Sequence, residues 1–329
     1  MPVFHPHLSF GLPGLASRLS IWLALLFCGA AARAAEGLWE AAPAMQHARA
    51  AHAVVGTGDG IYALAGTRDG GKAVLEVERF DGKLWQLETR MPGAGLNAPA
   101  AAALDGRIYL IGGFNTNTNV PTTQVLVYDT RTRQWSAGAP LPAPRGGHAA
   151  VVLDGVIHVL GGGNSMATIA DHSSYDPVDN TWRALAPLPR AEGSPAAVVY
   201  GGKLYAIGGR SGAADFGDVY LYDAAKDTWS SGPGIEPRGT AGAVAYCGAI
   251  YLFGGESQAR QQTLDSVLTL RSPASSWEPA PAMPTARSFA RAVLFGGAVY
   301  VVGGSPSYGN SHGASGSAAT ERFYKGCGS

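Results

Sequence analysis

The 329-residue chain has no excess of charge of either sign. It holds 24 Lys and Arg against 24 Asp and Glu, and charged residues make up only 15% of the sequence. A sparse and balanced charge argues against a basic face for nucleic acid and against an acidic field. Hydrophobic residues reach 46%, which is ample for a packed core and argues against disorder.

Metal-binding patterns are missing as well. The eight histidines include no H-x-x-x-H or H-E-x-x-H spacing, which are typical arrangements of metal ligands on one helix. We therefore expect no metal site and no other cofactor.

The sequence has one long hydrophobic run, and it lies near the N-terminus. Arg18 precedes the segment LSIWLALLFCGAAA, which leads into Ala32-Arg33-Ala34. A basic residue, an apolar run and an A-x-A pattern are typical of a secretory signal peptide. A membrane anchor is the alternative, but the run is shorter than the roughly 20 residues of a spanning helix. We predict a signal peptide over 1–34, cleavage after Ala34, export to the periplasm or the cell exterior, and no stable membrane insertion.

Cysteine is scarce. Cys28 lies in the predicted signal peptide, which leaves Cys247 and Cys327 in the mature chain 35–329. An exported protein can keep a disulfide, so this pair is compatible with one bridge or with two unrelated thiols.

Glycine, in contrast, is abundant, and much of it recurs in one pattern. The segment RIYLIGGF (107–114) places a glycine pair at the end of a strand, and related segments recur at 61–67, 156–163, 203–210, 250–256 and 299–305. Tryptophan follows the same lattice, with spacings of 46 to 50 residues between Trp39, Trp85, Trp135, Trp182, Trp229 and Trp277. The chain is therefore built from repeats.

Each repeat has the same internal order. A small-residue apolar run leads to a hairpin signal such as Asp154-Gly155. The strand that ends in Gly-Gly comes next, then a polar loop of variable length, a third strand, a short turn and the Trp. Four short strands per period of about 48 residues are typical of a propeller blade. Glycine without a Cβ permits close backbone approach where the inner strands converge.

These motifs resemble the kelch repeat: Gly-Gly after the second strand, Tyr-Asp on the third and Trp on the fourth. Two units depart from the pattern, with Ala65-Gly66 in the first and Leu270-Arg271 in the fifth. The resemblance implies an all-β, six-bladed kelch β-propeller over 35–329. The last unit has no Trp, so we expect the N-terminal strand around Trp39 to complete the last blade and close the ring.

The Gly-Gly loops are the expected binding region. They are long and varied and share one face of the ring, whereas the hairpins on the other face are short and uniform. Asn, Ser, Thr and Gln dominate these loops, with Phe114, Phe216 and Tyr308 among them. This composition suits a glycan or a peptide or protein ligand more than a phosphate; the alternative is that the loops are merely solvated.

Four arginines align in the loop before the first strand of a blade: Arg49, Arg145, Arg238 and Arg287. Blade 4 has Glu192 at this place and blade 2 has Leu96. One interpretation is a ring of guanidinium groups at the channel mouth that receives an acidic small molecule. The other is that each Arg binds loop carbonyls and holds its own blade.

The loop after the fifth Gly-Gly suggests one enzymatic alternative. It contains Glu256 and Arg260, and exported sialic acid epimerases (mutarotases) with kelch propellers use a Glu and an Arg on one loop. The likeness implies a carboxylate that shuttles a proton beside an Arg that binds a carboxylated sugar. A binding module without catalysis remains the leading prediction.

The predicted blades also place the two cysteines. Cys247 lies in the first hairpin of blade 5 and Cys327 comes after the third strand of blade 6. Both belong to the face opposite the Gly-Gly loops, which permits the bridge.

Overall fold

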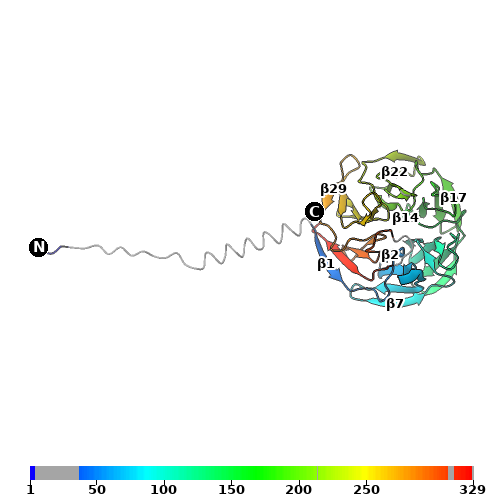
Figure 1. Cartoon of the computed structure of the whole chain (residues 1–329), viewed down its shortest axis with the longest axis horizontal. Coiled ribbons are helices and arrows are strands. Elements are labelled where there is room, and N and C mark those ends of the chain that lie inside the picture. The colour runs from blue at the N-terminus through cyan, green and yellow to red at the C-terminus, as the bar shows by residue number, and fades with distance from the viewer. Residues whose placement is uncertain (4–36, 213, 310–314, 328–329) are drawn as a thin grey trace.

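The computed structural model describes residues 1–3, 37–212, 214–309 and 315–327. Over these residues the chain forms six four-stranded antiparallel sheets, arranged around a centre like the blades of a propeller (Figure 1). The predicted all-β six-bladed propeller is confirmed. Residues 4–34 of the predicted signal peptide, with its cleavage site, lie outside the described residues. No helix in the described part of the chain is long and apolar enough to cross a membrane.

In each blade the first strand lies innermost and the last lies at the rim, as β2 and β7 illustrate (Figure 1). Blades 1 to 3 consist of β2 (Ala53–Thr57), β3 (Gly60–Leu64), β6 (Glu76–Phe80) and β7 (Trp85–Arg90); β9 (Ala100–Leu104), β10 (Arg107–Ile111), β12 (Val125–Asp129) and β13 (Gln134–Ala137); and β14 (Ala149–Leu153), β15 (Val156–Leu160), β16 (His172–Asp176) and β17 (Thr181–Leu185). Blades 4 to 6 consist of β18 (Ala196–Tyr200), β19 (Lys203–Ile207), β22 (Val219–Asp223) and β23 (Thr228–Ser231); β24 (Gly242–Tyr246), β25 (Ala249–Phe253), β28 (Val267–Leu270) and β29 (Glu278–Ala280); and β30 (Arg291–Phe295), β31 (Ala298–Val302), β32 (Thr320–Tyr324) and β1 (Leu38–Ala42).

The Gly-Gly loops, together with the loop before β9, add short pairs of strands on one face of the ring. These are β4 (Thr67–Arg68) with β5 (Lys72–Ala73), β8 (Leu96–Asn97) with β11 (Phe114–Asn115), β20 (Arg210–Ser211) with β21 (Ala214–Asp215), and β26 (Glu256–Ser257) with β27 (Gln262–Thr263), besides the single 3-10 turn η1 (Asp69–Gly71) described in the structure. The loops therefore form a distinct layer on one face of the ring.

The core lies between the blades. In β10 every residue from Ile108 to Ile111 is buried, because both faces of the strand are covered by other sheets. Ile108 and Leu110 pack with residues of blade 1, whereas Tyr109 and Ile111 pack with residues of blade 3. A continuous apolar run at this place is what two-sided burial requires.

The N-terminal strand closes the ring as predicted. β1 pairs antiparallel with β32, with Trp39 opposite Phe323, and in Figure 1 the blue β1 lies beside the red C-terminal strands. The ring of Trp39 packs on Phe323 at 5.0 Å between centroids. Its indole N–H donates to the carbonyl of Pro281 in blade 5 at 2.9 Å. The first segment of the propeller thus completes the last blade.

The tryptophan lattice joins neighbouring blades. Trp182 and Trp229 donate to the carbonyls of Ala139 and Ala186 in the preceding blade, each at 2.9 Å. Trp277 makes the equivalent bond to Pro233 at 2.8 Å. In these three blades the Trp packs a large apolar area and also bonds the preceding sheet through its one N–H donor.

The glycine pairs also join blades. Both members have positive φ, as in Gly112 (57°) and Gly113 (98°), and a Cβ on Gly112 would lie 2.6 Å from the carbonyl oxygen of Arg145. The N–H of the second glycine donates to the next blade in all six pairs: Gly66 to Leu96, Gly113 to Arg145, Gly162 to Glu192, Gly209 to Arg238, Gly255 to Arg287 and Gly304 to Arg49, at 2.8 to 3.1 Å. We call these six bonds the blade joints. Close approach without a Cβ is the reason for the motif.

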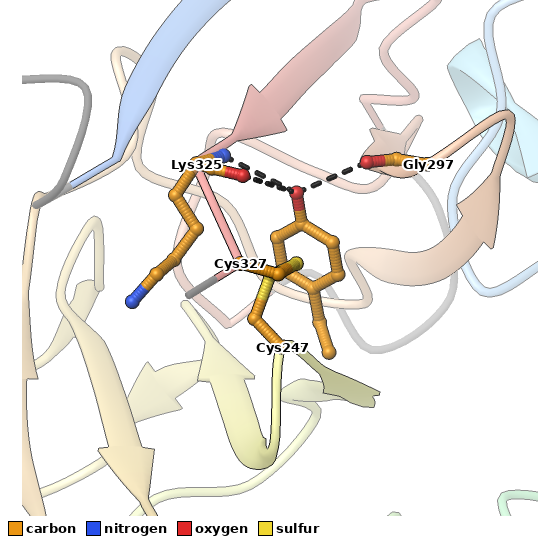
Figure 2. Close-up of a disulfide and its surroundings, with 5 residues drawn as sticks. Cys247, Gly297, Lys325 and Cys327 are labelled. Carbon is orange, nitrogen blue, oxygen red and sulfur yellow. Dashed lines mark hydrogen bonds between the residues drawn. A yellow bond between two sulfur atoms is a disulfide. The ribbon is translucent and has the colours of Figure 1, made fainter. Parts of the chain in front are cut away.

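A disulfide joins blade 5 to the end of the chain. Cys247 and Cys327 are bonded, with their Cα atoms 4.9 Å apart (Figure 2). Beside them the hydroxyl of Tyr246 donates to the carbonyls of Gly297 and Lys325 at 3.0 and 3.2 Å. The bridge that the sequence left open is therefore formed, and it fixes the segment after β32.

Candidate functional site

The mouth of the central channel on the Gly-Gly-loop face is bordered by a ring of backbone. Six residues, each two positions before an inner strand, have φ between 47° and 62°: Ala51, Ala98, Gly147, Ser194, Thr240 and Phe289. We call them the mouth ring. Inter-blade N–H···O bonds of 2.6 to 3.1 Å run from Ala98 to Ala51, Gly147 to Ala98, Ser194 to Gly147 and Thr240 to Ser194. The left-handed conformation costs a non-glycine residue about 1–2 kcal/mol, and such strain concentrates at functional sites.

Directly outside this ring stand the residues that come after each Gly-Gly pair. We call this place the post-glycine position; it holds Thr67, Phe114, Gly163, Arg210, Glu256 and Ser305. Each bridges back to the entry loop of its own blade, as Arg210 does to Gly193 and Glu256 to Gly239. On the neighbouring blades 4 and 5, the two residues at this position, Arg210 and Glu256, contact each other.

A pocket of about 200 Å³ opens at this mouth. Its lining combines two aromatic rings with polar groups: Phe114, Phe289, Arg210, Ser194, Asn97 and Thr168. We call it the mouth pocket. Phe114 packs against a small cluster of Phe289 with Ala51 and Ala98, so one wall of the pocket is apolar. The rest of the lining consists of the polar residues named above and of loop glycines such as Gly146 and Gly193.

The charge of Arg210 in this pocket is neutralised. Its guanidinium forms an ion pair with Glu256 of the next blade, and its Cζ lies 5.6 Å from the centre of the Phe289 ring. The side chain of Arg210 is 18% exposed, whereas that of Glu256 is fully buried. An ion pair with one member exposed presents donors but little net charge. The mouth pocket therefore suits a polar, uncharged ligand with an apolar group that rests on the phenylalanines.

Glu256 and Arg260, the two residues that the epimerase alternative would use, have different partners. Glu256 turns toward Arg210, while Arg260 lies at the surface and forms an ion pair with Glu236. The two residues close in sequence therefore serve different partners. The side chains that the epimerase alternative needs around one ligand are not brought together.

Of the two interpretations of the aligned arginines, the structure supports the one in which each Arg holds its own blade. Arg49, Arg145, Arg238 and Arg287 are at most 2% exposed, and each guanidinium lies inside its own blade. The Nη1 group of Arg145, for example, donates to the carbonyls of Gly161 and Asp171 at 3.3 Å. Burial lowers the pKa of all four. The structural interpretation holds, because the loop carbonyls take these donors away from the channel mouth.

Blade 4 carries a carboxyl group where four other blades carry this arginine. Glu192 is fully buried, and neither of its carboxylate oxygens has a hydrogen-bond partner in the described part of the chain. Burial raises the pKa of Glu192 to about 8, with Asp218 adding repulsion. Arg190 does not neutralise it, since its guanidinium pairs with Asp218 at 2.7 Å. Glu192 is thus a buried acid without a counter-ion.

Of the predicted aromatic residues only Phe114 lines the mouth pocket. Phe216 lies under Arg190, whose Cζ is 4.5 Å from its ring centre, and Tyr308 is 36% exposed in the sixth loop. Sequence reasoning missed Arg210, Phe289 and Ser194. Aligning the residue after each Gly-Gly, and the residue two before each inner strand, would have found all three.

Two buried histidines belong to the core. Over the described ranges, no group of three or more His, Cys, Asp and Glu side chains is placed to hold a metal ion. The buried pair His158 and His172, with Nδ1 of the first 2.9 Å from Nε2 of the second, packs against Tyr222 and Trp229. This pair belongs to the core between blades 3 and 4.

Comparisons with known proteins agree with this architecture. A family model described as "KLHDC2/KLHL20/DRC7 Kelch-repeats domain" matches residues 98–304. Alpha-scruin of Limulus polyphemus is 33% identical over 142 residues, which cover 42% of this chain and 15% of that protein. Kelch-like protein 36 of Mus musculus is 31% identical over 121 residues, 35% of this chain and 20% of that protein. The matched regions are thus small parts of those relatives.

One solved structure, titled "Structure of YjhT", superposes with a TM-score of 0.71. It covers 85% of this chain and 96% of its own, at 14% sequence identity. At that identity the likeness concerns the fold alone.

Proposed function

The chain belongs to the kelch-repeat β-propeller family, and we propose that it acts as a binding module through the mouth pocket on its Gly-Gly-loop face. The observation that carries the proposal is the pocket of about 200 Å³ in which Phe114 and Phe289 meet the neutralised Arg210. Such a site takes one apolar group of a polar, uncharged ligand. A glycan or a peptide segment of a partner protein has this chemistry.

The loops support this proposal by their rigidity at the pocket. The bridges between Gly193 and Arg210 and between Gly239 and Glu256 fix the two members of the ion pair to their blades. Asp215 accepts a hydrogen bond from the backbone N–H of Gln258 on the next loop at 2.5 Å. A preformed pocket loses little conformational entropy when it binds.

Glycan and peptide arrays probed with the purified protein test the proposal. The ligands that bind are then measured against Thr168→Trp, which fills the pocket, and against Met166→Trp. Met166 lies in the same loop, is highly exposed and does not line the pocket. We expect Thr168→Trp to weaken binding at least tenfold, about 1.4 kcal/mol, and Met166→Trp to bind normally. Equal binding by both variants would place the ligand elsewhere.

Binding without catalysis is favoured over the epimerase alternative. Proton transfer in an anomer exchange requires a carboxylate that reaches the substrate, and Glu256 is buried behind its ion pair with Arg210. Exchange of a carboxylated sugar at the rate of buffer alone is the expected result. Exchange that is fast and is lost in Glu256→Gln would restore the enzymatic alternative.

We further propose that the protein works outside the cytoplasm, after removal of residues 1–34. The Cys247–Cys327 disulfide supports this proposal, because such bonds persist in oxidising compartments. N-terminal sequencing of the exported protein tests it. A mature chain beginning at Ala35 or a neighbouring residue is expected, and a cytoplasmic protein with an intact N-terminus would contradict it.

A further inference from the structure

The six innermost strands begin with five small residues and one arginine. The first residue of each strand faces the last residue of the next, as Ala53 faces Leu64 and Arg291 faces Val302. At this register the blades place Ala53, Ala100, Ala149, Ala196, Gly242 and Arg291. The small residues of five blades therefore leave space near the axis, and blade 6 contributes a guanidinium group to that space.

These strands enclose a cavity of about 120 Å³ below the mouth ring, which we call the channel cavity. Arg291 lines it together with His148 and the small residues of the other blades. None of its lining residues lines the mouth pocket. The channel cavity is therefore a separate site, and its chemistry is independent of the proposed function.

Arg291 has no acidic partner. Among the described residues no carboxylate lies within ion-pair distance of its guanidinium, whereas the buried Arg49 and Arg287 pair with Glu78 and Glu321. The one hydrogen bond that the described residues provide runs from its Nε to the carbonyl of His52 at 2.9 Å. Both Nη groups thus remain available on the side of the cavity.

The remaining charges do not compensate for this cation. Burial lowers the pKa of Arg291 to about 10, so the group stays protonated at neutral pH. Burial and the nearby guanidinium groups lower the pKa of His148 to about 3, and that ring stays neutral. Arg291 is partly exposed to the channel, and a guanidinium fork without a carboxylate partner matches a small anion with two parallel donors.

We propose that the channel cavity binds a small monovalent anion on Arg291, either a carboxylate such as formate or acetate or a halide. A second cavity of about 330 Å³ continues along the channel, and Ala150, Ala197, Ala243 and Ala292 line both. The anion therefore has a path from the hairpin face that does not pass the mouth pocket.

Chloride-35 NMR line broadening tests this site on the purified protein. We expect a saturable broadening that acetate displaces. Arg291→Ala gives blade 6 the residue that four other blades carry, so it should keep the fold while its affinity for chloride falls at least tenfold. Arg68→Ala removes the same charge from an exposed place in β4 and should behave like the parent protein.

Three outcomes would overturn the proposal. They are the absence of saturable broadening, broadening that survives in Arg291→Ala, and equal loss in Arg68→Ala. Should Arg291→Ala fail to fold, Arg291→Lys keeps the charge but not the fork, and weaker yet saturable binding is expected from it; unchanged affinity would contradict recognition by the guanidinium. Displacement by acetate but not by bromide identifies the carboxylate as the preferred anion, and the reverse identifies the halide.

Discussion

The second glycine of each Gly-Gly pair and the residue after it are neighbours in sequence, yet the former is the same in all six repeats and the latter differs in every repeat. All six second positions are glycine, and all six donate to the next blade. The six post-glycine positions hold six different residues, from Gly163 to Phe114 and Arg210. The close backbone bond between blades requires glycine at the second position. Packing of the blades does not require any particular side chain at the post-glycine position. We infer that the joints stabilise the ring and that, if the proposed function holds, the variable residues at the mouth select the ligand.

The largest effect is expected from opening the ring. Deleting Leu38–Ala42 removes β1 together with the bond from Trp39 to Pro281 and exposes an edge of β32. Because the deletion leaves blade 6 with three strands and removes its Trp39 bond to blade 5, we expect a large loss, up to the whole stability of about 5–15 kcal/mol. Thermal unfolding of chains that begin at 35 and at 43 measures it. Equal melting would show that the blades hold without closure.

The next largest effect is expected at Arg49, one of the four aligned buried arginines. In Arg49→Ala the buried Glu78 loses its partner at 2.5 Å, and the carbonyls of Ala65 and Glu76 lose their donor. Breaking a buried pair costs about 3–5 kcal/mol. The exposed Arg68→Ala should change the free energy of unfolding by less than about 0.5 kcal/mol. Denaturant unfolding compares the two, and similar losses would contradict a structural role for Arg49.

A smaller loss is expected from the disulfide. Cys247 and Cys327 are 80 residues apart in sequence, and their bond restricts the unfolded chain. Replacing both by Ser should cost about 2–4 kcal/mol without changing ligand binding at the opposite face. In melting experiments, reductant should lower the stability of the parent protein by the same amount as the double substitution does. It should not change the stability of the double variant. A reductant effect on the double variant would point to another cause.

The smallest effect on stability is expected from Glu192→Gln, and it depends on pH. The folded pKa of about 8 lies above the ordinary value of 4.5, so between these values the native state holds a proton that the unfolded state has released. Stability therefore falls as pH rises through this window. The variant should match the parent near pH 4.5 and exceed it above pH 8 by on the order of 1–3 kcal/mol. An advantage that does not grow with pH would show that Glu192 is ionised in the fold.

The fold was predictable because its determinants recur. Trp39 to Trp277 and the glycine pairs are spaced by the blade itself, and the missing last Trp pointed to closure by the N-terminal strand. The site was less predictable, because the spacing of the repeats gives the position of a residue but not the direction of its side chain. Arg145 lies in a loop at the channel mouth, but its guanidinium points into its own blade because carbonyl oxygens there accept its hydrogen bonds. Glu256 and Arg260 lie in one loop, yet the partner of Glu256 is Arg210 at the same position of the neighbouring blade.

Binding by Phe114→Ala tests the separation of joints and mouth most directly. Phe114 and Phe216 are both partly buried aromatic residues of the Gly-Gly loops, but only Phe114 lines the mouth pocket. Calorimetric titration with a ligand found on the arrays should show at least tenfold weaker binding for Phe114→Ala and unchanged binding for Phe216→Ala. Both variants should keep the closed six-bladed propeller. Equal affinities for the two variants, or binding lost only in variants that also lose the fold, would contradict the account.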